Sequence, residues 1–243
     1  MKAGLLAAVA LGGGVLGAGA VHVASRYGPL KGGVERVQTE RIVRDYLISH
    51  PEVLVEASSA LRRRETGKAI DADRAAIVEP FGNAWAGNPK GDVTIVEYFD
   101  YNCGYCRATL PVVDALLGSD SGLRIVYRDW PILSAESATA ARYSLVAADM
   151  GKFREFHEAL YAGGPVSDTT LAAAIAAAGL DMAKVKAAAA SPRIEAELSR
   201  NLDIAKKLGM SGTPSWVIGD DVISSALPLE ELKRLVAEAR TKR

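Results

Sequence analysis

The chain has 243 residues, of which 49% are apolar and 24% are charged, a balance typical of a globular protein with a sizeable core. Its 29 Lys and Arg residues equal its 29 Asp and Glu residues, so the formal net charge is zero. The sequence therefore lacks the excess positive charge that marks most nucleic-acid-binding proteins, and no nucleic-acid partner is expected.

The N-terminal stretch indicates export. Residues 3–24 contain no charged residue, and a helix of that length would extend about 33 Å, enough to cross a bilayer core. The small residues Ala18-Gly19-Ala20 resemble a signal-peptidase site. We predict that residues 1–25 are either a cleaved signal peptide or a retained membrane anchor, and both alternatives place the remainder of the chain outside the cytoplasm.

Residues 26–79 are expected to form a linker and a short helical segment. Residues 26–37 contain three glycines, a proline and mixed charges, which favours a tether. Two helices are predicted to follow, each with an apolar stripe: Ile42, Val43, Tyr46 and Leu47 in the first, and Val53, Leu54, Ala57 and Leu61 in the second. So short a segment cannot bury these stripes alone. Residues 38–66 should therefore either cover the main domain or meet copies of themselves in a homo-oligomer.

Residues 80–243 have the pattern of an α/β domain that carries a helical insertion. Val93–Phe99 is rich in β-branched and aromatic residues, as in a buried strand. A helix at 103–117, strands at 123–130, 216–218 and near 222, and a last helix from 229 complete the predicted α/β part. Between them, residues 134–209 read as helices, with Ser134, Ser167, Asp181 and Ser191 as N-caps.

The main chemical signal is the motif Asn102-Cys103-Gly104-Tyr105-Cys106, which lies between a predicted buried strand and a helix. At the start of a helix, unpaired N–H groups and the helix dipole favour a thiolate. This placement lowers a cysteine pKa, and the thiolate is the attacking species in disulfide exchange. We therefore assign Cys103 as the accessible nucleophile and Cys106 as the buried resolving thiol. The alternative is a passive local disulfide.

With this motif, the chain resembles the thioredoxin superfamily and, within it, the bacterial DsbA-like family, over most of residues 80–240. Glu97 stands six residues before Cys103, where the family has a buried acid that moves protons for the resolving thiol. Thr213-Pro214 matches the cis-proline loop that faces the dithiol and binds substrate. The helical block at 134–209 fits the family's insertion. The resemblance implies a thioredoxin fold with catalytic Cys103, Cys106 and Glu97.

The resemblance extends to a particular branch of the family. Gly104-Tyr105 between the cysteines and Thr213 before the proline are similar to the bacterial disulfide isomerases and to proteins of the suppressor-of-copper-sensitivity protein C type. Residues 38–66 resemble the oligomerising segment of the latter. The likeness implies a periplasmic enzyme, soluble or tethered to the inner membrane, that forms or isomerises disulfides in unfolded or misoxidised client proteins. A membrane redox partner would reset its dithiol.

Two functions of other classes stay open. The chain could be a non-enzymatic holdase or binding module in which the dithiol is secondary, or a minor Cu(I) carrier that uses two thiolates as soft ligands. The three histidines, His22, His50 and His157, are scattered, so neither a zinc site nor any cofactor is predicted. His157 is expected to be a packed or surface residue, and Trp130 a core residue, without a catalytic role.

Overall fold

The computed structural model describes residues 29–242. The expected signal peptide or anchor at residues 1–25 lies outside the described residues. Within residues 29–242, no helix combines the length and the apolar character that crossing a membrane requires. The chain divides into two compact units, Met1–Ala60 and Leu61–Arg243.

The first unit contains helix α2 (Pro29–Ser49) and the beginning of helix α3 (Glu52–Val78). Helix α2 already begins at Pro29, so most of the tether expected at residues 26–37 is helical. The apolar side chains of these two helices are largely uncovered. Residues more than half exposed are Val37, Ile42, Val43, Tyr46, Ile48, Leu54 and Val55. Of the predicted stripes within this unit, Ile42, Val43, Tyr46 and Leu54 are thus exposed, whereas Leu47 and Val53 are half-buried.

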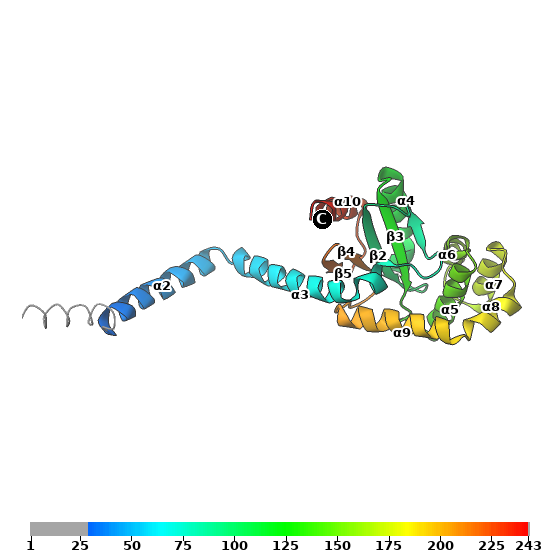
Figure 1. Ribbon diagram of the computed structural model, residues 1–243, viewed down its shortest axis with the longest axis horizontal. Helices are drawn as coiled ribbons and strands as arrows, with labels where there is room; N and C mark the ends of the chain where they lie inside the picture. The colour runs from blue at the N-terminus through cyan, green and yellow to red at the C-terminus, as the bar shows by residue number, and fades with distance from the viewer. Residues whose placement is uncertain (1–28, 243) are drawn as a thin grey trace, which may run out of the picture. The chain divides into compact units, whose positions relative to one another are not determined.

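The second unit is built on a five-stranded sheet with the order β1-β3-β2-β4-β5 (Figure 1). Its strands are β1 (Trp85–Gly87), β2 (Val93–Phe99), β3 (Leu123–Asp129), β4 (Ser215–Ile218) and β5 (Asp221–Ile223). Strands β2 and β3 are parallel and joined by helix α4 (Gly104–Ser119), and all other neighbours are antiparallel. Helix α10 (Leu229–Thr241) contacts α4 and β2. This arrangement is the predicted thioredoxin fold.

Alternation along β2 divides the core into two parts. Ile95 and Phe99 belong to the larger cluster, together with α4 and most of the insertion. Val96 and Tyr98 belong to a second cluster, which residues of α3 and α9 cover from the other face. Glu97 shares the parity of Ile95 and Phe99, so its side chain points toward α4 and the dithiol.

The predicted insertion comprises five helices (Figure 1): α5 (Ala135–Asp149), α6 (Phe153–Ala162), α7 (Asp168–Ala177), α8 (Met182–Ala189) and α9 (Pro192–Lys207). The predicted caps Ser134, Ser167 and Asp181 each accept a backbone N–H of the first turn. Ser191 also holds an N-cap position, but its side chain makes no capping hydrogen bond.

The second unit begins earlier in the chain than the sequence suggests. We expected the boundary at residues 79/80, whereas the compact unit starts at Leu61. The reason is that α3 continues to Val78 and buries Gly67, Ile70 and Ile77. Ile70 and Ile77 are fully buried and pack with Val96 and Tyr98 of β2. This half of α3 is therefore part of the catalytic domain's core.

A buried arginine fixes the end of α3. Arg128 on β3 is 2% exposed, lies 2.5 Å from the Glu197 carboxylate of α9, and donates to the carbonyls of Ala76, Ile77 and Glu79. Carbonyls in the last turn of a helix lack partners within the helix. The Arg128 guanidinium supplies those partners and links α3, β3 and α9.

Removing this guanidinium should destabilise the fold strongly. We expect Arg128→Met to lower the free energy of unfolding by about 3 kcal/mol, because Glu197 keeps only the half-exposed Arg200 and the α3 carbonyls lose their donor. Arg142→Met removes a more exposed arginine–glutamate pair, with Glu195, and should cost less than about 1 kcal/mol. Urea unfolding of both variants measures the difference. Equal losses would show that Arg128 acts as an ordinary surface charge.

Candidate active site

The dithiol lies where β2 passes into α4, as predicted. Cys103 is the N-cap of α4, in extended backbone conformation. Its Sγ accepts a hydrogen bond from the backbone N–H of Cys106 at 3.3 Å. Cys106 lies in the first turn of the helix and is 2% exposed. The two sulfurs are therefore held at one helix end, with Cys103 in the position that favours negative charge.

The surroundings of Cys103 favour its thiolate. A hydrogen bond from the Cys106 thiol, followed by the influence of the Thr213 side chain and of the backbone N–H groups at the start of the helix, lowers the pKa of Cys103 to about 6 against the opposing effect of burial. At pH 7, roughly nine-tenths of Cys103 would be ionised. Cys103 is nevertheless only 5% exposed. The sequence suggested an accessible thiol, and the structure shows a covered one with a small opening.

Cys106 has the opposite character. Burial, the hydrogen bond that its thiol gives to Cys103, and the charge of Glu97 together raise the pKa of Cys106 far above its ordinary value. Exposure separates the two cysteines little, but the pKa separates them clearly. Cys103 therefore has the character of a nucleophile, whereas Cys106 would react only after a base had taken its proton.

Glu97 is a buried carboxyl group that interacts electrostatically with both cysteines. Its side chain is 4% exposed. Burial raises the pKa of Glu97 to about 8, a hydrogen bond from Thr109 acts in the opposite direction, and the charge of Cys103 adds to the increase. The charge of Glu97 in turn contributes to the raised pKa of Cys106. A carboxyl group that titrates near neutral pH beside a thiol can exchange protons with it.

The loop before β4 closes the site on the other side. The peptide bond between Thr213 and Pro214 is cis, as predicted. The Cys103 thiol donates to the Thr213 carbonyl at 3.2 Å. The Thr213 hydroxyl is buried and makes no hydrogen bond to any residue that the structure describes. This hydroxyl is thus available to the Cys103 sulfur when that sulfur is ionised.

Asp100 and Asn102, for which the sequence predicted no role, hold the dithiol loop in place. The Asp100 carboxylate accepts hydrogen bonds from the backbone N–H groups of Asn102, Ile132 and Leu133 and from the Ser137 hydroxyl. Asn102 donates to Ser134 and Ser137 and accepts from the Val166 N–H. The loop is therefore fastened to the helical insertion. The sequence did not indicate that Asp100 and Asn102 bind the insertion, because Asp and Asn are also common in ordinary turns.

An apolar surface adjoins the loop. The residues between the cysteines face outward: Tyr105 is 71% exposed, and a Cβ added to Gly104 would meet no atom within 4 Å. Ile132 and Leu133, whose backbone is bound to Asp100, are also exposed. These side chains form an apolar patch, consisting of Tyr105, Ile132 and Leu133, on segments joined directly to the dithiol loop.

His157 and Trp130 are both buried, and both contact residues other than the two cysteines. The His157 Nδ1 atom lies 3.1 Å from the Tyr101 hydroxyl, and burial lowers the pKa of His157 to about 3. Trp130 packs edge-on against Tyr98. Among the described residues, no group of three or more His, Cys, Asp or Glu side chains is arranged to hold a metal ion.

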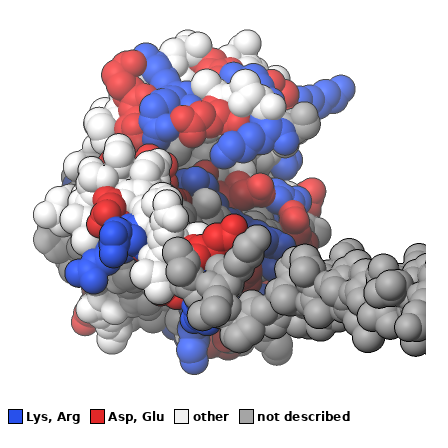
Figure 2. All heavy atoms as spheres, turned by 90° about the vertical axis from the view of Figure 1, so that its left-hand side faces the viewer, with Lys and Arg blue, Asp and Glu red and all other residues white. Residues whose placement is uncertain are grey.

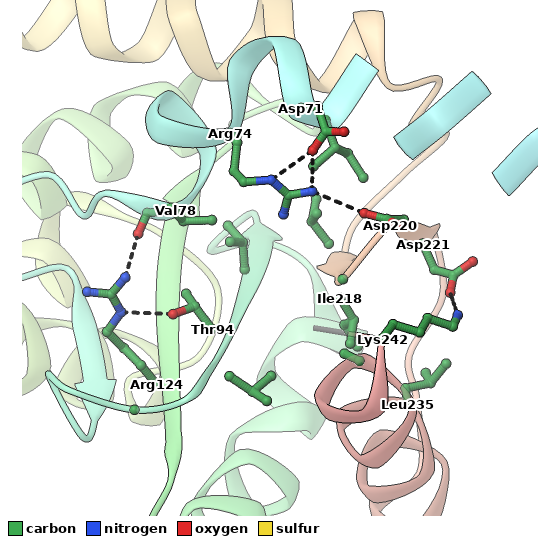
Figure 3. A pocket seen from close by; sticks show the side chains of 17 residues that line it. Asp71, Arg74, Val78, Thr94, Arg124, Ile218, Asp220, Asp221, Leu235 and Lys242 are labelled. Atoms are coloured by element: carbon green, nitrogen blue, oxygen red, sulfur yellow. Dashed lines mark hydrogen bonds and ion pairs between the residues drawn. The ribbon is translucent and has the colours of Figure 1, made fainter. Parts of the chain in front are cut away.

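A cavity of about 540 Å³ lies away from the dithiol, between α3, the sheet and α10 (Figure 3). Its charged side chains bind one another or the backbone: Arg74 pairs with Asp71 and Asp220, and Arg124 donates to the Val78 carbonyl and to Thr94. On the face shown in Figure 2, basic and acidic side chains are interspersed. Neither feature marks a second catalytic centre.

Comparison with known proteins decides the family. Residues 94–237 match the family model described as DSBA-like thioredoxin domain. The chain belongs to the DsbA-like thioredoxin family. Residues 35–66 match the Copper resistance protein ScsC N-terminal domain. The resemblance stated from the sequence is thus confirmed for both segments, and the DsbA-like family supports oxidoreductase activity.

Solved structures agree with this assignment. A thioredoxin-like oxidoreductase from Silicibacter pomeroyi DSS-3 is 37% identical, with a TM-score of 0.66, over 69% of this chain and 98% of its own. A linker-deletion variant of Proteus mirabilis ScsC is 25% identical, with a TM-score of 0.64, over 89% of this chain and 100% of its own. The second match thus extends beyond the DsbA-like domain.

A curated relative carries a related segment within a different protein. The Na(+)/H(+) antiporter NhaA 1 of Salinispora arenicola is 28% identical over 165 residues, which are 67% of this chain. The chain spans only about a quarter of the length of that antiporter, because the matched segment is 25% of it.

Proposed function

We propose that this protein is an exported thiol–disulfide oxidoreductase that forms or isomerises disulfide bonds in envelope proteins. The observation that carries the proposal is the difference between the two thiols: the pKa of Cys103 is lowered to about 6, whereas that of Cys106 is strongly raised beside Glu97. At neutral pH, Cys103 would thus be mostly ionised and able to attack, whereas Cys106 would stay protonated. We propose the periplasm as its location and a membrane redox partner as the agent that resets the dithiol.

The reaction follows from these charges. The Cys103 thiolate attacks one sulfur of a client disulfide, a Cys103–client bond forms, and the second client sulfur leaves as a thiolate. In isomerisation, a different client thiolate attacks the client sulfur of this mixed disulfide, so that a new client disulfide forms and Cys103 leaves as a thiolate. If this fails, ionised Glu97 takes the proton of Cys106. The Cys106 thiolate then attacks the Cys103 sulfur, and the client leaves reduced while a Cys103–Cys106 disulfide forms. Oxidation of a client runs through the same steps in reverse.

The surface around Cys103 suits an unfolded client. The Thr213 carbonyl, 3.2 Å from the Cys103 sulfur, is a backbone acceptor beside the reacting atom. An extended client segment could pair with this loop as an added strand. The apolar patch of Tyr105, Ile132 and Leu133 would bind the apolar side chains that an unfolded protein exposes. We therefore assign Thr213 and Pro214 to substrate binding.

Assembly would favour the isomerase direction. The exposed stripes of the first unit lie within or beside residues 35–66, the segment that matches the ScsC N-terminal domain. We propose that this segment forms a homo-oligomer through these stripes, since contiguous exposed apolar surface marks an interface. Several dithiols would then surround one client, which suits the repeated attack and release that reshuffling needs.

Charges placed within the stripe test this proposal in the intact chain. Val43→Asp with Leu47→Asp should dissociate the oligomer in sedimentation velocity and reduce the refolding of scrambled ribonuclease at least about tenfold, because each desolvated carboxylate costs several kcal/mol at an interface. Reduction of insulin, which needs one dithiol, should persist. Arg41→Asp is the matched control, because the exposed Arg41 lies on the opposite face of α2 from Val43 and Tyr46. A wild-type chain that sediments as a monomer would contradict the proposal and favour a monomeric oxidase.

A further inference from the structure

Thr109 lies between the resolving cysteine and the buried acid. It is in the second turn of α4, three residues after Cys106, and is 3% exposed. Its hydroxyl oxygen lies 2.6 Å from the Cys106 carbonyl oxygen and 3.1 Å from Glu97 Oε1. Thr109 is the one side chain for which the described structure gives a hydrogen bond to the Glu97 carboxyl group.

The Thr109 hydroxyl cannot donate to the Cys106 carbonyl and to Glu97 at the same time, because it has a single proton. When Glu97 is protonated, its O–H can donate to the Thr109 oxygen while Thr109 donates to the nearer Cys106 carbonyl. When Glu97 is ionised, it can only accept, so Thr109 must turn its proton toward the carboxylate. The Cys106 carbonyl then keeps only the ordinary backbone bond of the helix.

We propose that Thr109 is a positioning residue for the dithiol reaction: its hydroxyl proton turns from the Cys106 carbonyl to Glu97 whenever Glu97 is ionised, and thereby stabilises the carboxylate that accepts the proton of Cys106. The proposal rests on the proposed function, and it assigns a role to a residue outside the cysteine motif. A hydrogen bond to an ionised acceptor is stronger than one between neutral groups, so Thr109 favours the ionised form of Glu97.

The other groups around Glu97 do not provide this stabilisation. Cys103 and Cys106 on α4 carry negative charge when ionised, and repel the carboxylate. Tyr127 on β3 and Tyr161 on α6 also interact with Glu97, and burial raises both of their pKa values, so they stay neutral. Without Thr109, burial and these neighbours would raise the pKa of Glu97 further, because Thr109 is the one group that lowers it.

Titration of Glu97 by carbon-13 NMR in the reduced full-length protein tests the inference, with Glu97→Gln used to assign the carboxyl signal. Thr109→Val keeps the shape of the side chain and removes the hydroxyl, and we expect it to raise the titration midpoint of Glu97 by about one pH unit. Thr109→Ser keeps the hydroxyl and should retain the wild-type midpoint. Thr109→Ala, which cannot overpack the site, should shift the midpoint in the same direction as Thr109→Val.

The rate at which Cys106 displaces glutathione from a Cys103–glutathione mixed disulfide gives a second measurement. Because a one-unit increase reduces the ionised fraction of Glu97 about tenfold at pH 7, Thr109→Val should slow release about tenfold there and reach the wild-type rate at high pH. Ser119→Ala is the matched control: the Ser119 hydroxyl donates to the Leu116 carbonyl in the same helix, at 2.9 Å, but has no contact with Glu97. It should change neither the midpoint nor the rate.

An unchanged or lowered midpoint in Thr109→Val and Thr109→Ala would overturn the inference, even if Glu97→Gln slows glutathione release. Conversely, if the midpoint rises but Glu97→Gln releases glutathione at the wild-type rate, the hydrogen bond stands and the catalytic role of Glu97 in the proposed function fails. The two proposals are therefore separated by the same set of variants.

Discussion

Replacing Cys106 with alanine is expected to turn the protein into a trap for its clients. The Cys103 thiolate remains able to attack, but no second sulfur can displace the client from the mixed disulfide. Covalent complexes should accumulate and appear on non-reducing gels of the envelope fraction. The pKa of Cys103 should also rise above about 6, because the hydrogen bond from the Cys106 thiol is the largest effect that lowers it.

Cys103→Ala is the matched variant and should trap nothing. The remaining thiol, Cys106, is buried with a strongly raised pKa, so almost none of it is ionised at pH 7. Insulin reduction should fall at least about 1,000-fold, since the thiolate is the reacting species. Circular dichroism would verify that both variants fold. Equal trapping by the two variants would contradict the assignment of nucleophile and resolving thiol.

Glu97→Gln should give the second-largest loss. The amide keeps the shape of the side chain but cannot take the Cys106 proton, so resolution of the mixed disulfide should slow by about 100-fold at pH 8. In the wild type, the rate should rise with pH and level off above the Glu97 pKa of about 8. In the variant, this inflection should disappear. Stopped-flow measurement of glutathione release between pH 6 and pH 9 tests both statements.

The same substitution should also stabilise the protein, whereas replacing a carboxyl group that holds the fold together would destabilise it. The pKa of Glu97 is raised to about 8 in the folded state, so between about 4.5 and 8 the native protein binds more protons at this site than the unfolded chain does. Wild-type stability therefore falls as the pH rises through this window. Glu97→Gln lacks this penalty and should be more stable at pH 8 by a few kcal/mol. If the pH–rate profiles of the variant and the wild type coincided, Glu97 would be a buried carboxyl group without a role in the reaction.

The parts of the fold that the sequence predicted are those with strong local signals. β2 is a run of β-branched and aromatic residues, and its predicted bounds, Val93–Phe99, match the structure. The N-caps Ser134, Ser167 and Asp181 are side chains that satisfy helix N–H groups locally. The cysteine motif likewise needs only the junction of one strand and one helix.

Features that depend on distant contacts escaped prediction. β1 has only three residues and exists because it pairs with β3. The end of α3 was not expected to belong to the main domain, because its buried residues, Ile70 and Ile77, are few among many charges. Thr109 passed unnoticed because a threonine in a helix usually faces solvent. Its spacing of three from Cys106, on the face that also bears Val113 and Leu116, was the available signal.

The arginine that secures α3 also has a consequence for the order in which the chain assembles. The Ala76, Ile77 and Glu79 carbonyls are made first, whereas Arg128 follows about 50 residues later and Glu197 a further 69 residues after it. Until residue 197 has been made, the guanidinium has no buried counter-charge. The cysteines lie between these points, and the Thr213 carbonyl beside Cys103 follows all of them. Nearly the whole chain must therefore be made before its reactive centre is complete.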